Sequence, residues 1–159
     1  IQQLPGVLTD KIRSGVTLNS LPEAVAELLA NSIDSGAKSV TVIFNPRALN
    51  FVVEDDGHGI ASLDALGVRY CTSKIRSMAD LRNGVRTLGF RGEAISSLFS
   101  VAEEVCITTR ARGTFVTLSK QVKSGGSHVQ TGPSTVQLAH SGTTVSVKKL
   151  LYNQPVRQR

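Results

Sequence analysis

Residues 21–53 read LPEAVAELLANSIDSGAKSVTVIFNPRALNFVV, and this stretch decides the fold. Ser20, just before it, suits the N-cap of a helix, and Pro22 suits the first turn. Gly36 suits the position that follows a helix end, where the backbone often adopts a positive φ. We therefore expect a helix from Leu21 to Ser35.

The second part of the stretch predicts a β-hairpin. Side chains alternate in character along residues 40–44, residues 49–53 are mostly apolar, and Asn45-Pro46-Arg47 lies between the two segments. Asn and Pro both favour turns, so these residues are expected to connect two antiparallel strands.

Beyond the hairpin, glycines interrupt residues 57–92, and a second helix is expected to start near Gly92. Alternating segments joined by Gly- and Ser-rich turns then predict four strands, Val105–Thr109, Thr114–Ser119, Thr135–Leu138 and Thr143–Val147. A run of strands after helices indicates an α+β fold, with helices on one face of a mostly antiparallel, mixed sheet.

The composition is that of an ordinary globular protein. The length of 159 residues suits one domain, residues 1–159. Because the chain starts at Ile1 and stops after a basic stretch with no closing helix, we expect a piece of a longer protein. No apolar run approaches the roughly 18 residues of a membrane span, so no membrane role is expected. Cys71 and Cys106 lack metal-ligand spacing and fit free thiols in a reducing compartment.

Charge is divided unevenly along the chain. Residues 1–104 hold 10 Lys and Arg against 12 Asp and Glu, whereas residues 105–159 hold 8 Lys and Arg and no acid. A basic half can attract polyanions such as DNA or nucleotides. A piece cut from a longer protein can equally have lost acidic neighbours that balanced this charge.

Three polar motifs are candidates for chemistry. Glu27, Asn31 and Asp34 lie at i, i+4 and i+7, which places them on one stripe of the expected helix. Such a stripe is often no more than a solvated helix face.

The second motif is Val53-Glu54-Asp55-Asp56-Gly57-His58-Gly59-Ile60, in which a strand ends in acid and two glycines. A carboxylate at a buried strand end can accept a hydrogen bond from an exocyclic amine such as that of adenine, and glycine permits close approach to a ligand. A simple turn is the alternative. An EF-hand is disfavoured, because its spaced oxygen ligands are missing.

The third motif, Leu88-Gly89-Phe90-Arg91-Gly92-Glu93-Ala94, places glycines at the expected start of a helix. Free amides and the positive end of the helix dipole would attract phosphates there. The sequence has no G-x-x-x-x-G-K-[ST] motif, which excludes a P-loop nucleotidase. The histidines His58, His128 and His140 show no ligand spacing and are expected to be structural or surface residues.

Five motifs occur in order along the chain: E-x-x-x-N-x-x-D at 27–34, D-D-G-H-G at 55–59, T-S-K at 72–74, G-F-R-G-E-A at 89–94 and G-T-T at 142–144. Together with LYNQPVR at 151–157 they resemble the MutL family of ATPases, a branch of the GHKL superfamily. The resemblance extends over nearly the whole chain. It implies the GHKL, or Bergerat, fold, a two-layer sandwich of helices on a sheet.

The resemblance also implies a role for each motif in binding and hydrolysing ATP. Glu27 would polarise the attacking water, Asn31 would ligate Mg²⁺, and Asp55 would hold adenine with the help of Thr143. Further residues would complete the nucleotide site: Gly59 at the base pocket, Thr72, Ser73 and Lys74 along its wall, and Gly89, Phe90, Arg91 and Gly92 around the phosphates. The stretch from Cys71 to Leu88 would order over bound nucleotide as a lid.

In the same way, the resemblance implies partners. These are DNA and another MutL homologue as dimer partner, in DNA mismatch repair or in meiotic recombination, in the nucleus of a eukaryote or otherwise in the cytoplasm. Arg13-Ser14-Gly15 and Arg69-Tyr70-Cys71 are more similar to the eukaryotic homologue of meiotic crossing-over than to bacterial MutL. The competing hypothesis is a DNA-binding or scaffolding module without turnover.

Two features depart from the family pattern. Asp56 stands where the family usually has Asn, which adds a carboxylate beside a polyanionic ligand unless the side chain faces solvent. In the family, the lysine that binds the γ-phosphate belongs to a following domain, the transducer domain. A C-terminal dimerisation domain lies further along the family's chain. None of these lies within the 159 residues.

Overall fold

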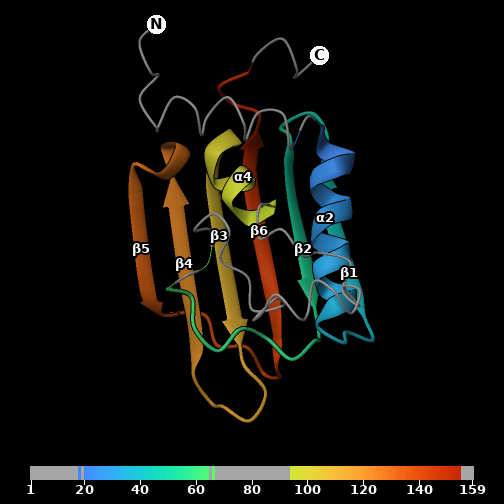
Figure 1. Ribbon diagram of the computed structural model, residues 1–159, viewed down its shortest axis with the longest axis vertical. Helices are drawn as coiled ribbons and strands as arrows, with labels where there is room; N and C mark the ends of the chain where they lie inside the picture. The colour runs from blue at the N-terminus through green and yellow to red at the C-terminus, as the bar shows by residue number, and fades with distance from the viewer. Residues whose placement is uncertain (1–17, 19, 65, 67–93, 155–159) are drawn as a thin grey trace, which may run out of the picture.

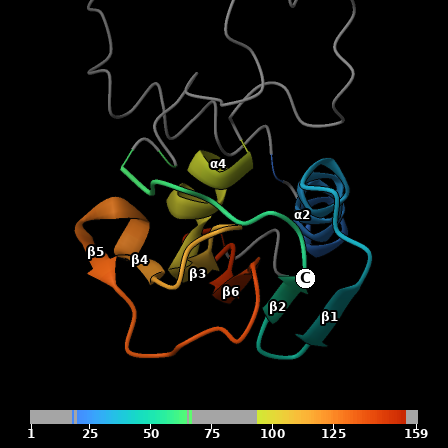
Figure 2. The same cartoon turned by 90° about the horizontal axis from the view of Figure 1, so that it is seen from below.

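The computed structural model describes residues 18, 20–64, 66 and 94–154. They form two layers, with helices α2 (Leu21–Asp34) and α4 (Ala94–Val101) on one face of a six-stranded sheet (Figures 1 and 2). Five strand pairs join in the order β1-β2-β6-β3-β4-β5, and all five are antiparallel. The expected α+β architecture is therefore confirmed.

Helix α2 begins and ends where the sequence signals lie. The Ser20 side chain accepts a hydrogen bond from the backbone amide of Glu23 at 3.4 Å, which caps the N-terminus. Ser35 is the C-cap, and Gly36 follows it with a φ of 71°. The helix buries Ala24, Leu28 and Ser32, which lie four residues apart along the face toward the sheet.

The hairpin of β1 (Val40–Asn45) and β2 (Asn50–Asp55) is confirmed, and its second strand continues two residues beyond the expected end. The Asn45 side chain accepts hydrogen bonds from the backbone amides of Arg47 and Ala48, which stabilises the turn. Because β2 extends to Asp55, this carboxylate belongs to the sheet rather than to a loop.

The later strands are β3 (Ala102–Arg110), β4 (Thr117–Lys123), β5 (His128–Pro133) and β6 (Gly142–Leu150). Three expectations differ here: residues 135–138 are not a strand, the strand expected at Thr114–Ser119 is β4 at Thr117–Lys123, and β5, an exposed edge strand, was not expected. Ser134 explains the first error, since its side chain accepts the backbone amide of Val136 and its carbonyl accepts the Gln137 side chain. These local bonds replace a strand ladder.

The core lies between the helices and the inner face of the sheet. Phe51 and Val53 of β2, Val145 and Val147 of β6, and Val105 and Ile107 of β3 meet there, together with Leu28 and Leu98 from the helices. Among residues 20–64 and 94–154, no helix has both the length and the apolar character needed to cross a membrane.

Candidate functional site

Asp55 is the centre of the candidate site. It ends β2, and its half-buried carboxylate is held from two sides. The Ser32 hydroxyl of α2 donates to Oδ2 at 2.9 Å, and the Gly57 amide donates to Oδ1 at 3.0 Å. A carboxylate offers about four acceptor positions. Two of them are therefore used by the protein, and the others can receive donors from a ligand.

Gly57 and Gly59 allow three elements to meet beside Asp55. A Cβ atom at Gly57 would lie 1.8 Å from the Ser35 Oγ atom, and one at Gly59 would lie 2.1 Å from the Arg110 carbonyl oxygen. Gly59 also has a φ of +69°. The two glycines thus let the chain pass between the end of α2 and the end of β3, which is a packing role that the sequence alone did not reveal.

Thr143 lies directly across from Asp55 in the pairing of β2 with β6. On its other side, Thr143 pairs with Thr109 of β3, and the two side-chain oxygens are 3.1 Å apart. Both threonines are buried. The structure therefore brings together Asp55, Thr143 and Gly59, three of the residues that the sequence motifs singled out, although they are up to 88 positions apart.

Asp56 points away from this group. Its Oδ1 atom accepts hydrogen bonds from the backbone amides of Lys38 at 2.7 Å and Ser39 at 2.9 Å, just before β1. These bonds, that of Ser39 first, hold the pKa of Asp56 below its ordinary value of 3.8. An Asn side chain has the same acceptor oxygen. The Asp56 carboxylate is exposed and serves the start of the hairpin, so the expected repulsion of a ligand does not follow.

Glu27 and Asn31 lie on α2, on the helix stripe beside the buried one. Glu27 is exposed and Asn31 is partly buried. Ser32, which binds Asp55, is five residues after Glu27, so the two positions are roughly 7.5 Å apart along the helix axis. The helix therefore connects the Asp55 site with a polar stripe that runs back toward its N-terminus.

Mg²⁺ is implied by the resemblance, and the residues present fit it. In the described part of the chain, His, Cys, Asp and Glu side chains form no group of three or more that could hold a metal ion. Mg²⁺ does not require such a group, because it keeps several waters and takes phosphate oxygens as ligands. A single amide oxygen from Asn31 is compatible with that coordination.

The remaining expected site residues lie outside the described residues. These are Thr72, Ser73, Lys74, Gly89, Phe90, Arg91 and Gly92, together with the expected lid from Cys71 to Leu88. Their roles stay predictions.

Sequence reasoning missed two polar residues at the site and one buried lysine elsewhere in the sheet. Ser32 and Thr109 are buried and bind site atoms, but Ser32 fills an unspecified position of the motif at 27–34 and Thr109 belongs to no motif. Lys120 of β4 is also buried, and its ammonium donates to the carbonyl oxygens of Leu63 and Leu66 at 2.9 and 2.8 Å. Burial lowers the pKa of Lys120. For Thr109 and Lys120 the available signal was a polar residue at an inward-facing strand position, and for Ser32 a polar residue on the apolar face of the helix.

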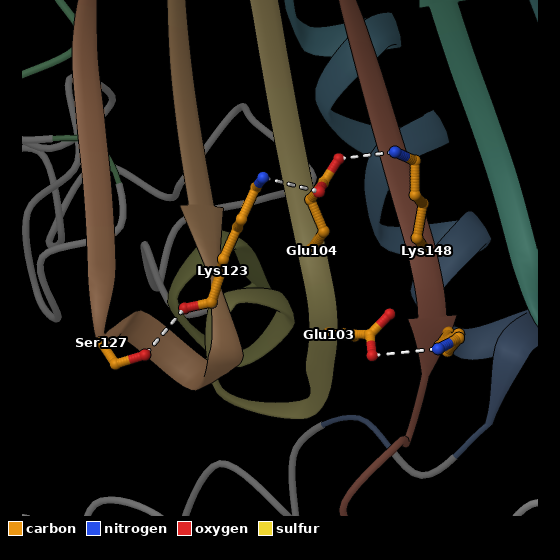
Figure 3. Close-up of polar contacts among 6 residues, drawn as sticks. Glu103, Glu104, Lys123, Ser127 and Lys148 are labelled. Carbon is orange, nitrogen blue, oxygen red and sulfur yellow. Dashed lines mark hydrogen bonds and ion pairs between the residues drawn. The ribbon is translucent and has the colours of Figure 1, made fainter.

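The basic half of the chain carries less free charge than its sequence implies. Glu104 lies between Lys123 and Lys148 (Figure 3), with nitrogen–oxygen distances of 3.5 and 2.7 Å. Glu103 binds Lys149 at 3.0 Å. The hydrogen bond with Lys148 lowers the pKa of Glu104 and raises that of Lys148. Glu103 and Glu104, the last two acids of the acidic half, therefore lie next to lysines of the basic half.

Arg110 is also engaged within the protein. Its guanidinium donates to the carbonyl oxygens of Thr114, Leu138 and Ala139, and it lies 5.3 Å from the centre of the Phe115 ring. The described part of the chain therefore gives little support to a dedicated nucleic-acid surface on the basic half.

The two-layer fold and the Asp55 carboxylate with its two glycines define a nucleotide-binding domain of the GHKL class. A family model described as "Histidine kinase-, DNA gyrase B-, and HSP90-like ATPase" matches residues 19–150. The chain belongs to this family.

Similar relatives are MutL-type proteins. Human DNA mismatch repair protein Mlh3 is 40% identical over 151 residues, which are 94% of this chain and 10% of that protein. DNA mismatch repair protein MutL from Chlorobaculum parvum is 38% identical over 162 residues, which are 100% of this chain and 25% of that protein. The chain thus spans between a tenth and a quarter of these relatives.

Solved structures agree with this assignment. The chain is similar to an N-terminal domain of a DNA repair protein, with a TM-score of 0.69 and 31% identity over 94% of this chain and 41% of the other. It is also similar to the Aquifex aeolicus MutL ATPase domain complexed with ADP, with a TM-score of 0.59 and 25% identity over 89% of this chain and 47% of the other. The chain is an ATPase domain with MutL proteins as homologues.

Proposed function

We propose that this domain binds ATP with its base at Asp55 and its phosphates along the Glu27–Asn31 stripe of α2, and hydrolyses it with Glu27 as general base. The observation that carries the proposal is the Asp55 carboxylate, fixed by Ser32 and Gly57 at the end of that same helix. An ADP complex of a structurally similar MutL domain supports a nucleotide as ligand.

In the proposed reaction, the Glu27 carboxylate accepts a proton from the attacking water as its oxygen bonds to the γ-phosphorus. The bond to the β,γ-bridging oxygen breaks, and ADP and phosphate leave. Mg²⁺ held by Asn31 would neutralise phosphate charge when bound. Exposure of Glu27 in the described structure leaves its carboxylate open to a water molecule.

Glu27→Ala tests the assigned base. We expect ATP affinity to be retained and single-turnover hydrolysis to fall about 10²–10⁴-fold, since a general base typically contributes that much. The measurement uses the complete protein, and Glu54→Ala is the control because Glu54 is an exposed acid of β2. Unchanged single-turnover hydrolysis in Glu27→Ala would remove Glu27 from the mechanism.

We further propose that nucleotide binding and hydrolysis drive dimerisation with another MutL homologue in DNA mismatch repair or meiotic recombination. Similarity to proteins named for mismatch repair, one of them human Mlh3, supports this setting. A nuclear location follows if the organism is eukaryotic.

The second candidate is a DNA-binding or scaffolding module without turnover, which the charge of residues 105–159 favours. The pairing of Lys123, Lys148 and Lys149 with Glu103 and Glu104 weakens it. Isothermal titration of the complete protein with a non-hydrolysable ATP analogue and Mg²⁺ separates the two. No binding at millimolar concentration would favour the scaffold.

A further inference from the structure

A pair of buried hydroxyl groups lies beside Asp55. Thr109 of β3 is fully buried, and its Oγ1 atom makes three contacts. It accepts from the backbone amide of Ile60 at 2.9 Å, donates to the carbonyl oxygen of Gly142 at 2.9 Å, and lies 3.1 Å from Thr143 Oγ1. The first two partners each have a fixed role, because an amide can only donate and a carbonyl can only accept.

Counting protons fixes the direction of the third contact. A hydroxyl group has one hydrogen and two lone pairs. The hydrogen of Thr109 is used by Gly142, and one lone pair is used by Ile60. The remaining lone pair faces Thr143, so Thr143 must be the donor in the pair.

This direction determines what Thr143 can offer to a ligand. Its hydrogen is directed to Thr109, and its oxygen retains lone pairs. Thr143 lies directly across from Asp55, whose carboxylate is also an acceptor. Side chains directly opposite on one sheet face have Cβ atoms about 5 Å apart. The Asp55 carboxylate and the Thr143 hydroxyl oxygen are therefore two neighbouring acceptors in the proposed base site.

We propose that Thr109 is a positioning residue that holds the Thr143 hydroxyl as an acceptor, so that the pocket selects a purine with a 6-amino group over one with a 6-oxo group. The inference rests on the proposed nucleotide site. A 6-amino group has two hydrogens, which it can donate directly to Asp55 and Thr143. A 6-oxo group presents lone pairs to both, so these two acceptors face an acceptor, and the N1–H of the 6-oxo form can satisfy only one of them.

The experiment compares two non-hydrolysable analogues, the β,γ-imido forms of ATP and ITP, by calorimetry with Mg²⁺ and the complete protein. Their bases differ only at the 6-position and the adjacent N1. In Thr109→Val the Thr143 hydroxyl loses its acceptor and can turn to donate to a 6-oxo group. We expect the preference for the ATP analogue to fall about fivefold, the equivalent of one net hydrogen bond. Thr109→Ser keeps the hydroxyl and should keep the preference.

An unchanged preference in Thr109→Val, with both affinities retained or lowered equally, would show a merely structural role and overturn the inference. If Thr109→Val does not fold because the Ile60 amide loses its acceptor, Thr143→Val decides. It should weaken the ATP analogue selectively, and equal weakening of both analogues would overturn the inference. Absence of binding to the wild-type protein would instead reject the proposed nucleotide site, and the inference with it.

Discussion

Asp55 is held in place before any ligand arrives, because the Ser32 hydroxyl and the Gly57 amide both donate to its carboxylate. The Gly57 amide can only donate, so its side of the carboxylate does not tolerate an amide nitrogen, whereas the Ser32 hydroxyl could turn to accept from one. The same two hydrogen bonds therefore fix the position of the Asp55 carboxylate and of both its oxygens.

Asp55→Asn is expected to lower affinity for an ATP analogue by roughly 10–100-fold, the equivalent of one hydrogen bond to a charged group. The amide NH₂ would either face the Gly57 amide as a second donor or force the Ser32 hydroxyl to turn from donor to acceptor. Calorimetry on the complete protein measures the change. The control is Glu54→Gln, one residue earlier and exposed, which removes the same charge from the strand. Equal affinity of Asp55→Asn and the wild type would exclude Asp55 from the base pocket.

Asp56 leads to a prediction about pH. Its folded-state pKa is lowered, so it stabilises the fold above its ordinary pKa of 3.8, and this contribution is lost as pH falls through the folded-state value. Asp56→Asn keeps the acceptor for Lys38 and Ser39 but does not titrate. We expect Asp56→Asn to bind the ATP analogue as the wild type does and to lose less stability below pH 4 in chemical unfolding. Asp56→Ala, which lacks the acceptor, should be less stable than either at neutral pH.

At the scale of elements, three parts of the chain pack together around Gly59. These are the end of α2, the end of β2 and the β3–β4 connection. His58 contributes to this junction through its backbone, which donates to Ser35 and accepts from Arg112. A side chain at Gly59 would strike the Arg110 carbonyl, which belongs to the sheet and cannot move alone. Backbone packing at this junction therefore fixes the position of Asp55 and its neighbours.

Gly59→Ala is therefore expected to destabilise the fold and weaken nucleotide binding. Gly113→Ala is a matched control, because Gly113 also has a positive φ, +80°, but a Cβ there meets nothing within 4 Å. The left-handed backbone costs about 1–2 kcal/mol in both variants. Overpacking adds about 1–3 kcal/mol in Gly59→Ala alone. Denaturant unfolding measures the difference, and equal losses would mean that the junction relaxes without cost.

The elements show how far the sequence predicts the fold. Helix α2 and the hairpin of β1 and β2 were predicted because their caps, turn and periodicity are local. Strand β5 was missed, since it is an exposed edge strand whose ladder depends on β4. In the site, Asp55 and Thr143 followed from motifs, whereas Ser32 and Thr109 did not. Their importance comes from contacts 23 and 34 positions away, which no local pattern contains.

At the scale of the whole molecule, β6 lies between β2 and β3, which brings the C-terminal strand into the centre of the sheet (Figure 1). The same topology brings Lys148 to Glu104, so the boundary between acidic and basic halves disappears in the folded chain. Net charge along a sequence is therefore a weak guide to a nucleic-acid surface here. The folded structure shows instead which lysines form ion pairs with an acid.

Glu104→Gln is expected to strengthen binding to duplex DNA in low salt, because it releases Lys123 and Lys148 to contact phosphates. Each new phosphate contact steepens the dependence of log affinity on log salt by about 0.9, so two lysines steepen it by up to about 1.8. Glu54→Gln makes the same change in net charge on the same face of the sheet, with no lysine in an ion pair described for Glu54. Fluorescence anisotropy of labelled duplex DNA across a salt series measures both variants. If the two slopes are equal, net charge alone governs DNA binding, and the ion pairs of Glu104 do not restrain these lysines.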